Sequence, residues 1–449
     1  MSSIKDIGYI DFFNHPCICI QDGMDLILVP QKPEDNILPL SYLHNGRFSV
    51  KYTDSIGRNS VASVKQIHPN LSKSIILELD YIAKTYDNPI VDEFKMIGNE
   101  IDEFFSPIEY YYYQKRNNVY SPSDLLYKNE TADTYCVDYE SVRVTISLVY
   151  GDILSSGIRS DLTVHPQLII HFDKPQDLDF VFRFSQVIEK LLQFVLRKRK
   201  QNLKQLELLS IENDKKSNIG YLFSSLYNTD LRPQSRADAS FRLYGTKIAN
   251  LIELIASDNK FPVNHLNKET PNPYYYSTER FGALCSAFEY EYSKNENYKT
   301  FKPDYDRIKA QVINSIDSIN TQENHEKQFC KEAIQKVQSI GQQQGFSKKI
   351  LNAYNTNIAA FESSIDRIVF REKDINKIAR QIASLRGKVL HNEMGYEFDE
   401  QETEAIRFLE ILQFVMTLNR ATFTSTEIEI IIGALYYCND RYINSIVLS

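Results

Sequence analysis

Residues 371–395 read REKDINKIARQIASLRGKVLHNEMG, and this stretch predicts the architecture of the second half of the chain. Its apolar residues recur three and four positions apart, which places them on one stripe of an α-helix. Gly395 is a predicted stop, because glycine adopts the left-handed conformation of a helix end at little cost. A helix with one apolar stripe has to pack against other helices. The stripe consists of Ile375, Ile378, Ile382, Leu385 and Val389.

The segments around this helix have the same periodicity, so the second half is predicted to be all-α. The short connections between them favour an antiparallel bundle. The other predicted helices cover residues 278–294, 305–318, 326–343, 347–363, 403–420 and 426–441.

The first half has the pattern of a β-rich region instead. Short runs rich in β-branched and aromatic residues are separated by Pro, Gly, Asn and Asp, which is typical of a β-sandwich or a similar curled sheet. A helix over 175–200 follows, and its end, Arg197 to Lys200, is either a phosphate-binding patch or a set of cations that complement the helix dipole. The predicted strands are 17–21, 26–29, 47–53, 61–67, 74–81, 141–150 and 162–172.

The fold class predicted from these patterns is α+β. A sandwich-like β region with a sensing or regulatory role is expected over 1–215. A helical connector and linker over 216–276 follows, and residues 277–449 form the helical bundle. Several prolines and three consecutive tyrosines between residues 258 and 277 mark the connection between the halves.

Composition restricts the classes of function. The chain has 449 residues, 43% of them hydrophobic, with a formal net charge of −8. It is therefore expected to be globular. The negative net charge excludes a protein that coats nucleic acid through its overall charge, so any contact with RNA must come from a local basic patch. The six cysteines show no zinc-ligand spacing, so neither a metal nor another cofactor is expected. No apolar run approaches the ~20 residues of a membrane helix and no signal pattern is present, so we expect a cytoplasmic protein without a membrane partner.

Arg386 and His391 are the candidate catalytic residues, separated by four residues near the end of the predicted helix. In metal-free RNA cleavage the 2′-OH attacks the adjacent phosphorus, which leaves a 2′,3′-cyclic phosphate and a 5′-OH. A histidine titrates near neutral pH and can transfer that proton. An arginine presents a planar, permanently charged fork to the phosphate oxygens. Such a pair also arises by chance, as between Arg159 and His165, but that pair lies between predicted strands.

The two side chains are about 140° apart around an ideal helix, because each residue turns by about 100°. They therefore face one groove only if the helix ends near His391, or if two copies of the chain each contribute a helix. The second arrangement predicts a homodimer or a larger homo-oligomer.

The Arg–four residues–His spacing resembles the signature of the HEPN superfamily, many of whose members are metal-independent ribonucleases of toxin–antitoxin and anti-phage systems. Residues 279–290, ERFGALCSAFEY, are similar to the opening helix of the ApeA-type abortive-infection branch, in which an Arg-Phe pair begins the helix and a Glu ends it. The two motifs cover a small part of the chain, whereas the similarity in architecture extends over nearly all of it. This resemblance implies an endoribonuclease acting on RNA, with tRNA among the candidate substrates, and a trigger such as a ligand or a phage protein.

Three supporting residues complete the predicted site. Glu289 is expected to orient Arg386 or His391 through a charge-assisted hydrogen bond. Family members often have a polar residue directly after the arginine, where this chain has Gly387; Lys388 or Asn392 would supply that polarity.

Two other functions compete with a ribonuclease. The first is a non-catalytic binding or scaffold protein whose helical bundle has lost activity. Gly387, in place of a polar residue, would then reflect that loss. The second is a carbohydrate-active sandwich with paired carboxylates, although the acidic residues show no distinguishing spacing.

Overall fold

The computed structural model divides the chain into two compact units, residues 1–273 and 274–449. This boundary falls inside the segment that the prolines and tyrosines mark as a connection. The residues that the structure describes are 5–32, 34–38, 46–70, 73–85, 89–105, 130–153, 163–199, 203, 205–224, 241–267, 275–295, 298, 306–320, 323–339, 345–365, 372, 374–390 and 396–437.

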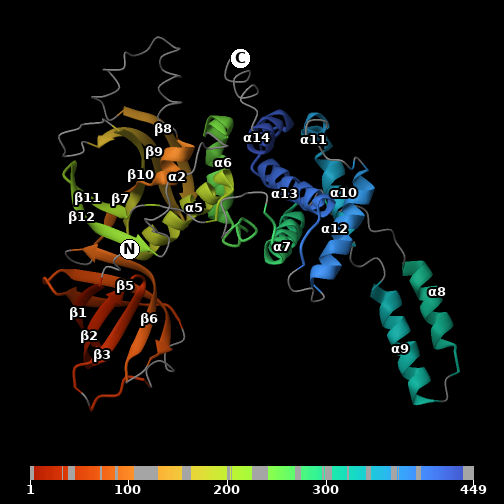
Figure 1. Ribbon diagram of the computed structural model, residues 1–449, viewed down its shortest axis with the longest axis horizontal. Coiled ribbons are helices and arrows are strands. Elements are labelled where there is room, and N and C mark those ends of the chain that lie inside the picture. Colours follow the sequence, from red (N-terminus) through yellow and green to blue (C-terminus); the bar gives the residue numbers. More distant parts are fainter. Residues whose placement is uncertain are drawn as a thin grey trace, which may run out of the picture. The chain divides into compact units, whose positions relative to one another are not determined.

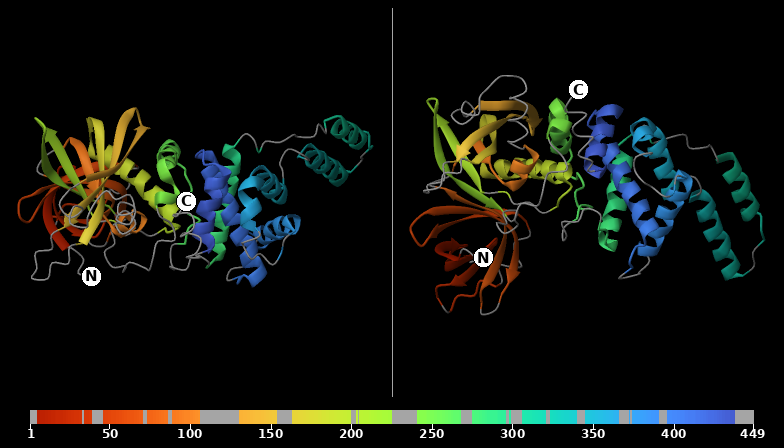
Figure 2. Two further views of the ribbon diagram at one scale, coloured as in Figure 1. Left: turned by 90° about the horizontal axis from the view of Figure 1, so that it is seen from above. Right: turned by 45° about the horizontal axis from the view of Figure 1, so that its top comes forward.

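The first six strands of unit 1 form a sheet that closes on itself. β3 pairs with β2 on one side and with β6 on the other, so the strands enclose a common interior (Figures 1 and 2). Apolar side chains such as Phe12, Leu26 and Leu77 fill it. Burial raises the pKa of the Cys17 thiol to about 11 and that of Cys19 to about 12, so both remain protonated at neutral pH. The strands are β1 Lys5–Phe12, β2 His15–Asp22, β3 Asp25–Pro30, β4 Phe48–Asp54, β5 Asn59–Pro69 and β6 Ile75–Thr85.

The sheet continues beyond β6 in the order β12, β11, β7, β10, β9 and β8, and every pair of neighbours is antiparallel. Of the two predicted arrangements, the curled sheet is therefore the one observed and the sandwich is wrong: the described strands form one sheet, which closes where β3 pairs with β6. The expected boundary at residue 215 is also wrong, because β12 begins there. These strands are β7 Val91–Met96, β8 Glu130–Tyr139, β9 Val142–Ile153, β10 Thr163–Gln176, β11 Leu206–Glu212 and β12 Lys215–Ser224.

Three helices complete the described part of unit 1: α2 Asn99–Phe104, α5 Leu178–Leu196 and α6 Ile248–Ser257. Asp177 caps α5 by accepting a hydrogen bond from the backbone N–H of Phe180 at 2.7 Å. At the other end Arg197 is buried in a left-handed conformation, and Lys198 donates to Glu103 at 2.6 Å. Burial of Arg197 and the ion pair of Lys198 with Glu103 therefore argue against an open phosphate-binding patch at these two residues.

Glu189 on α5 is a buried carboxyl with only 3% of its surface exposed. Burial raises the pKa of this carboxyl to about 8, because the charged form loses its hydration. The folded state therefore favours protonated Glu189, which contributes to stability at low pH and less as the pH rises from about 4.5 to about 8.

Glu189→Gln should remove this pH dependence. Relative to wild type, the variant should gain on the order of 3 kcal/mol in the free energy of unfolding of unit 1 between pH 5 and pH 8, since one pKa unit corresponds to about 1.4 kcal/mol. Urea unfolding, followed by hydrogen exchange of peptides from α5, measures this unit by itself. Glu253→Gln on the exposed side of α6 is the matched control. Parallel pH profiles for wild type and Glu189→Gln would contradict the expectation.

The described part of unit 2 is helical, as predicted (Figure 1). The segment predicted as one helix over 347–363 is two helices, because Asn357 interrupts it and its side chain donates to the carbonyl of Ala353 at 2.7 Å. Asp399 and Glu402 form a capping box that begins α13. The helices are α7 Thr278–Lys294, α8 Asp306–Asp317, α9 Asn324–Ser339, α10 Phe346–Thr356, α11 Ile358–Ile365, α12 Ile375–Leu390, α13 Glu400–Arg420 and α14 Ser425–Tyr437. None of the helices described in either unit has the length and apolar character needed to cross a membrane.

Candidate active site in the helical unit

The predicted apolar stripe positions α12 in unit 2. Ile378, Ile382 and Leu385 are at most 3% exposed, whereas Ile375 and Val389, at the two ends, are half-buried. Arg386 follows Leu385 directly, so its side chain leaves the helix at the border of the buried face. The side chain of Arg386 is 29% exposed.

Glu289 contacts Arg386, one of the two residues that it was predicted to orient. The Nη2 atom of Arg386 donates to Oε2 of Glu289 at 2.7 Å, across 97 residues of sequence. Glu289 lies in α7, which Ser277 caps by accepting a hydrogen bond from the N–H of Arg280 at 3.2 Å. Within the described residues Glu289 is the only hydrogen-bond partner of Arg386. The carboxylate therefore holds one arm of the guanidinium and leaves its other donors available.

Two residues of α10 complete this cluster. Lys349 donates from Nζ to Oε1 of Glu289 at 2.7 Å, so one carboxylate holds two cations. The guanidinium of Arg386 lies over the ring of Phe346, with Cζ 4.4 Å from the ring centroid. Phe346 in turn packs edge-on against Phe288. The cluster carries a net charge of +1, and side chains from three helices hold it.

Lys349 and Phe346 were not among the predicted site residues. They lie on a helix that the periodicity predicts, but nothing in the local sequence indicates that this helix brings a lysine to Glu289. The adjacent pair Lys348-Lys349 is the only local signal, and such pairs are common on solvated helix faces.

The other predicted residues are not part of the described cluster. His391, Asn392 and Gly395 are outside the described residues, which end at Leu390 and resume at Tyr396. Lys388 leaves α12 about 200° around the helix from Arg386. Its Nζ lies 3.8 Å from Oε1 of Glu402 and 5.5 Å from the ring centroid of Tyr396. These contacts are with the start of α13, so Lys388 does not share the environment of Arg386.

Gly387 is not required by packing against the described residues. A Cβ at this position would have nothing within 4 Å, and the backbone is ordinary helix. The space at this position is therefore compatible with a polar side chain.

Cys285 lies one turn before Glu289 and is excluded as a nucleophile. It is 3% exposed, and burial raises the pKa of its thiol to about 12, an effect that Arg386 opposes. Nucleophilic cysteines need the thiolate, which burial disfavours. Among the described residues no group of three or more His, Cys, Asp or Glu side chains is arranged to hold a metal ion.

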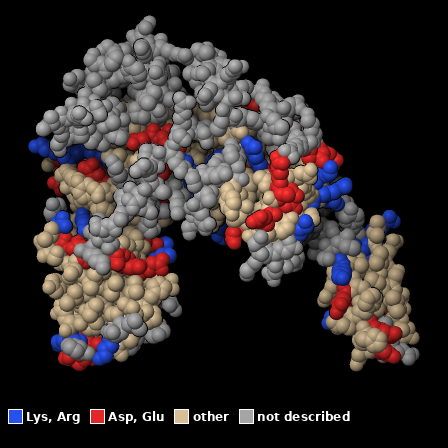
Figure 3. Space-filling view, in the orientation of Figure 1, with Lys and Arg blue, Asp and Glu red and all other residues tan. Residues whose placement is uncertain are grey.

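Charge is mixed on the face of the molecule that Figure 3 presents. Groups of Asp and Glu side chains lie beside groups of Lys and Arg over the described helices of unit 2. At Glu289 the excess of one positive charge depends on Arg386 and Lys349.

Comparison with known proteins finds no family model, curated protein or solved structure that matches this chain.

Proposed function

We propose that the helical unit is a metal-independent endoribonuclease in which Arg386 and His391 are the catalytic residues. The observation that supports this proposal most directly is the contact between Glu289 and Arg386. It fixes a partly exposed arginine side chain at the border of the buried face and uses one N–H donor of its guanidinium.

The chemistry follows from these side chains. Negative charge develops on the non-bridging oxygens of the scissile phosphate as the 2′-OH attacks. A pre-positioned guanidinium stabilises that charge more than it stabilises the ground state. His391 transfers the proton from the 2′-OH or to the departing 5′-oxygen. Glu289 acts as a positioning residue, because it contacts the guanidinium rather than the substrate.

A homodimer supplies the second half of the proposed groove. With the two side chains about 140° apart on an ideal helix, Arg386 of one copy and His391 of the other can face one phosphodiester. The resemblance to the HEPN superfamily supports a role in an anti-phage, abortive-infection or toxin system, with tRNA among the substrates. Control by an activating ligand or phage protein belongs to the same proposal, since an unrestrained ribonuclease would harm its own cell.

The alternative is a binding or scaffold protein without catalysis. One observation favours it. The contacts of Arg386 with Glu289 and Phe346 also stabilise the packing of α12 against α7 and α10. A structural role of this kind needs no histidine at position 391.

Purified chain incubated with total RNA in EDTA distinguishes the two functions. Cleavage that leaves 2′,3′-cyclic phosphate ends is expected, because no step needs a metal ion. RNA that is bound but remains intact would support the scaffold. Because a trigger is expected in cells, wild type and His391→Ala are also expressed in a bacterial host that is infected with phage, where wild type should arrest growth and degrade RNA and His391→Ala should not. Equal growth together with intact RNA in both strains would refute the ribonuclease.

A further inference from the structure

A cavity of about 580 Å³ lies where the closed sheet meets the rest of the sheet in unit 1. At this point β6 pairs with β5 on one side and with β12 on the other, so that Lys84 is opposite both Ser60 and Tyr221. Residues directly opposite each other in antiparallel strands project from the same face of the sheet. The volume is in the range of small-ligand sites, about 300–1,000 Å³. Among its lining residues are Arg58, Lys84, Gln205, Asn218, Gly220 and Tyr221.

The backbone of β12 forms a β-bulge at the wall of this cavity. Gly220 has a φ of 146°, and a Cβ there would lie 2.3 Å from the carbonyl oxygen of Lys84. The pairing register with β11 shifts at this point and leaves Ile219 without an opposite residue. Asn218 supports the bulge, because its Oδ1 accepts from the N–H of Gly220 at 2.9 Å and its Nδ2 donates to Glu207 at 2.9 Å. Only glycine permits this close approach of the two strands.

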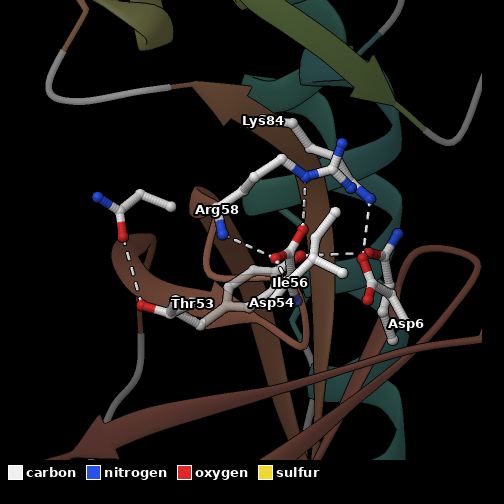
Figure 4. A network of polar contacts seen from close by, with 9 residues as sticks. Asp6, Thr53, Asp54, Ile56, Arg58 and Lys84 are labelled. Carbon is white, nitrogen blue, oxygen red and sulfur yellow. Dashed lines mark hydrogen bonds and ion pairs between the residues drawn. The ribbon is translucent and has the colours of Figure 1, made fainter.

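Two cations of the cavity are each held by an aspartate, as Figure 4 shows. Nε of Arg58 donates to Oδ2 of Asp54 at 2.9 Å, and Nζ of Lys84 donates to Oδ2 of Asp6 at 3.0 Å. Burial opposes ionisation of Asp54, but hydrogen bonds from Arg58 and from the N–H of Ile56 lower the pKa of this carboxyl overall. The terminal nitrogens of Arg58 have no other partner among the described residues, and two protons of Lys84 are likewise available. The two aspartates thus fix the positions of the Arg58 and Lys84 side chains and leave N–H donors of both available to a ligand.

The cavity also offers a stacking surface and an amide group. The ring of Tyr221 lies on β12 next to Lys84, and the residue is 37% exposed. Gln205 presents a side-chain amide to the same cavity. An exposed aromatic ring beside an amide is suited to a planar heterocycle with a hydrogen-bonding edge.

We propose that this cavity binds a nucleoside monophosphate. The phosphate accepts from the terminal nitrogens of Arg58 and from Lys84, and the base stacks on Tyr221. The four charges of Arg58, Lys84, Asp6 and Asp54 cancel, which favours a ligand with one phosphate over a triphosphate. This binding site is independent of the proposed ribonuclease, because it lies in the other unit and its test measures binding alone.

Isothermal titration of the full chain with AMP, GMP, CMP and UMP tests the proposal. At least one should bind with one site per chain, and the matching nucleoside and inorganic phosphate should each bind at least tenfold more weakly. Tyr221→Ala should weaken binding by about tenfold through loss of stacking. Arg58→Gln should weaken it by about tenfold or more through loss of charge-assisted hydrogen bonds. Asp54 keeps two backbone N–H donors in that variant, so the turn is expected to persist.

Arg143→Gln is the matched control, because Arg143 belongs to the same unit, pairs with Asp138 and does not line the cavity. Its affinity should equal that of wild type. Hydrogen exchange of β12 shows whether each variant is folded and whether the nucleotide protects the bulge. The proposal is overturned if none of the four nucleotides binds at millimolar concentration, or if folded Tyr221→Ala and Arg58→Gln both bind as tightly as wild type.

Discussion

Arg386→Gln should lower the rate of RNA cleavage by about 10²–10³-fold, the usual cost of losing one donor that stabilises transition-state charge. His391→Ala should lower it by about 10²–10⁴-fold, through loss of general acid–base catalysis. Both losses are expected in kcat more than in KM, because the interactions are proposed to strengthen in the transition state. Single-turnover cleavage of a defined RNA measures them directly.

Glu289→Gln is the informative companion variant. It preserves the shape of the side chain but weakens its hold on the guanidinium, so a smaller decrease of about tenfold is expected from a positioning residue. Arg380→Gln, an exposed arginine on the same helix, should cleave like wild type and controls for loss of general positive charge. If Arg386→Gln, prepared in parallel, cleaves as fast as wild type, the activity belongs to another site.

The helical part of the candidate site could be predicted because its signals are local. The stripe of α12 places Leu385 in the core, and Arg386 therefore lies at the border of the buried face. Glu289 was predicted to orient Arg386 or His391 through a charge-assisted hydrogen bond, and its carboxylate accepts from Arg386. Lys349 could not be predicted, because its approach depends on how α10 packs against α7.

In the β-rich unit the decisive contacts are between residues far apart in the sequence, so less of its fold could be predicted. Alternating patterns identify many strands, yet closure depends on pairing between Leu28 of β3 and Ile75 of β6, far along the chain. Nothing local distinguishes a sheet that closes from two sheets that face each other. The cavity beside Gly220 was missed for the same reason, since a lone glycine in a strand indicates a bulge without showing which strand approaches it.

Arg280 illustrates how burial changes the role of a residue. Its side chain is only 7% exposed and reaches Glu410 on α13. Nη2 of Arg280 donates to Oε1 of Glu410 at 2.8 Å, and the guanidinium lies over the ring of Tyr276, 4.3 Å from the centroid. Tyr276 donates its hydroxyl proton to the second oxygen of Glu410, and Arg280 also donates to the carbonyl of Tyr275. This network joins α7 to α13 and is distinct from the cluster at Glu289.

Arg280→Met should lower the free energy of unfolding of unit 2 by about 3–5 kcal/mol, because it leaves the Glu410 carboxylate buried without its guanidinium. The double variant Arg280→Met with Glu410→Met should recover most of that loss, since replacing a buried pair by apolar side chains of similar size is often close to neutral. Lys377→Met, at an exposed pair with Glu372 on the start of α12, is the control and should change little. Hydrogen exchange of α7 and α13 in urea measures these differences in unit 2 alone. If the double variant is as unstable as Arg280→Met, the pair stabilises the unit by specific contacts rather than by mutual neutralisation, and the argument from desolvation fails.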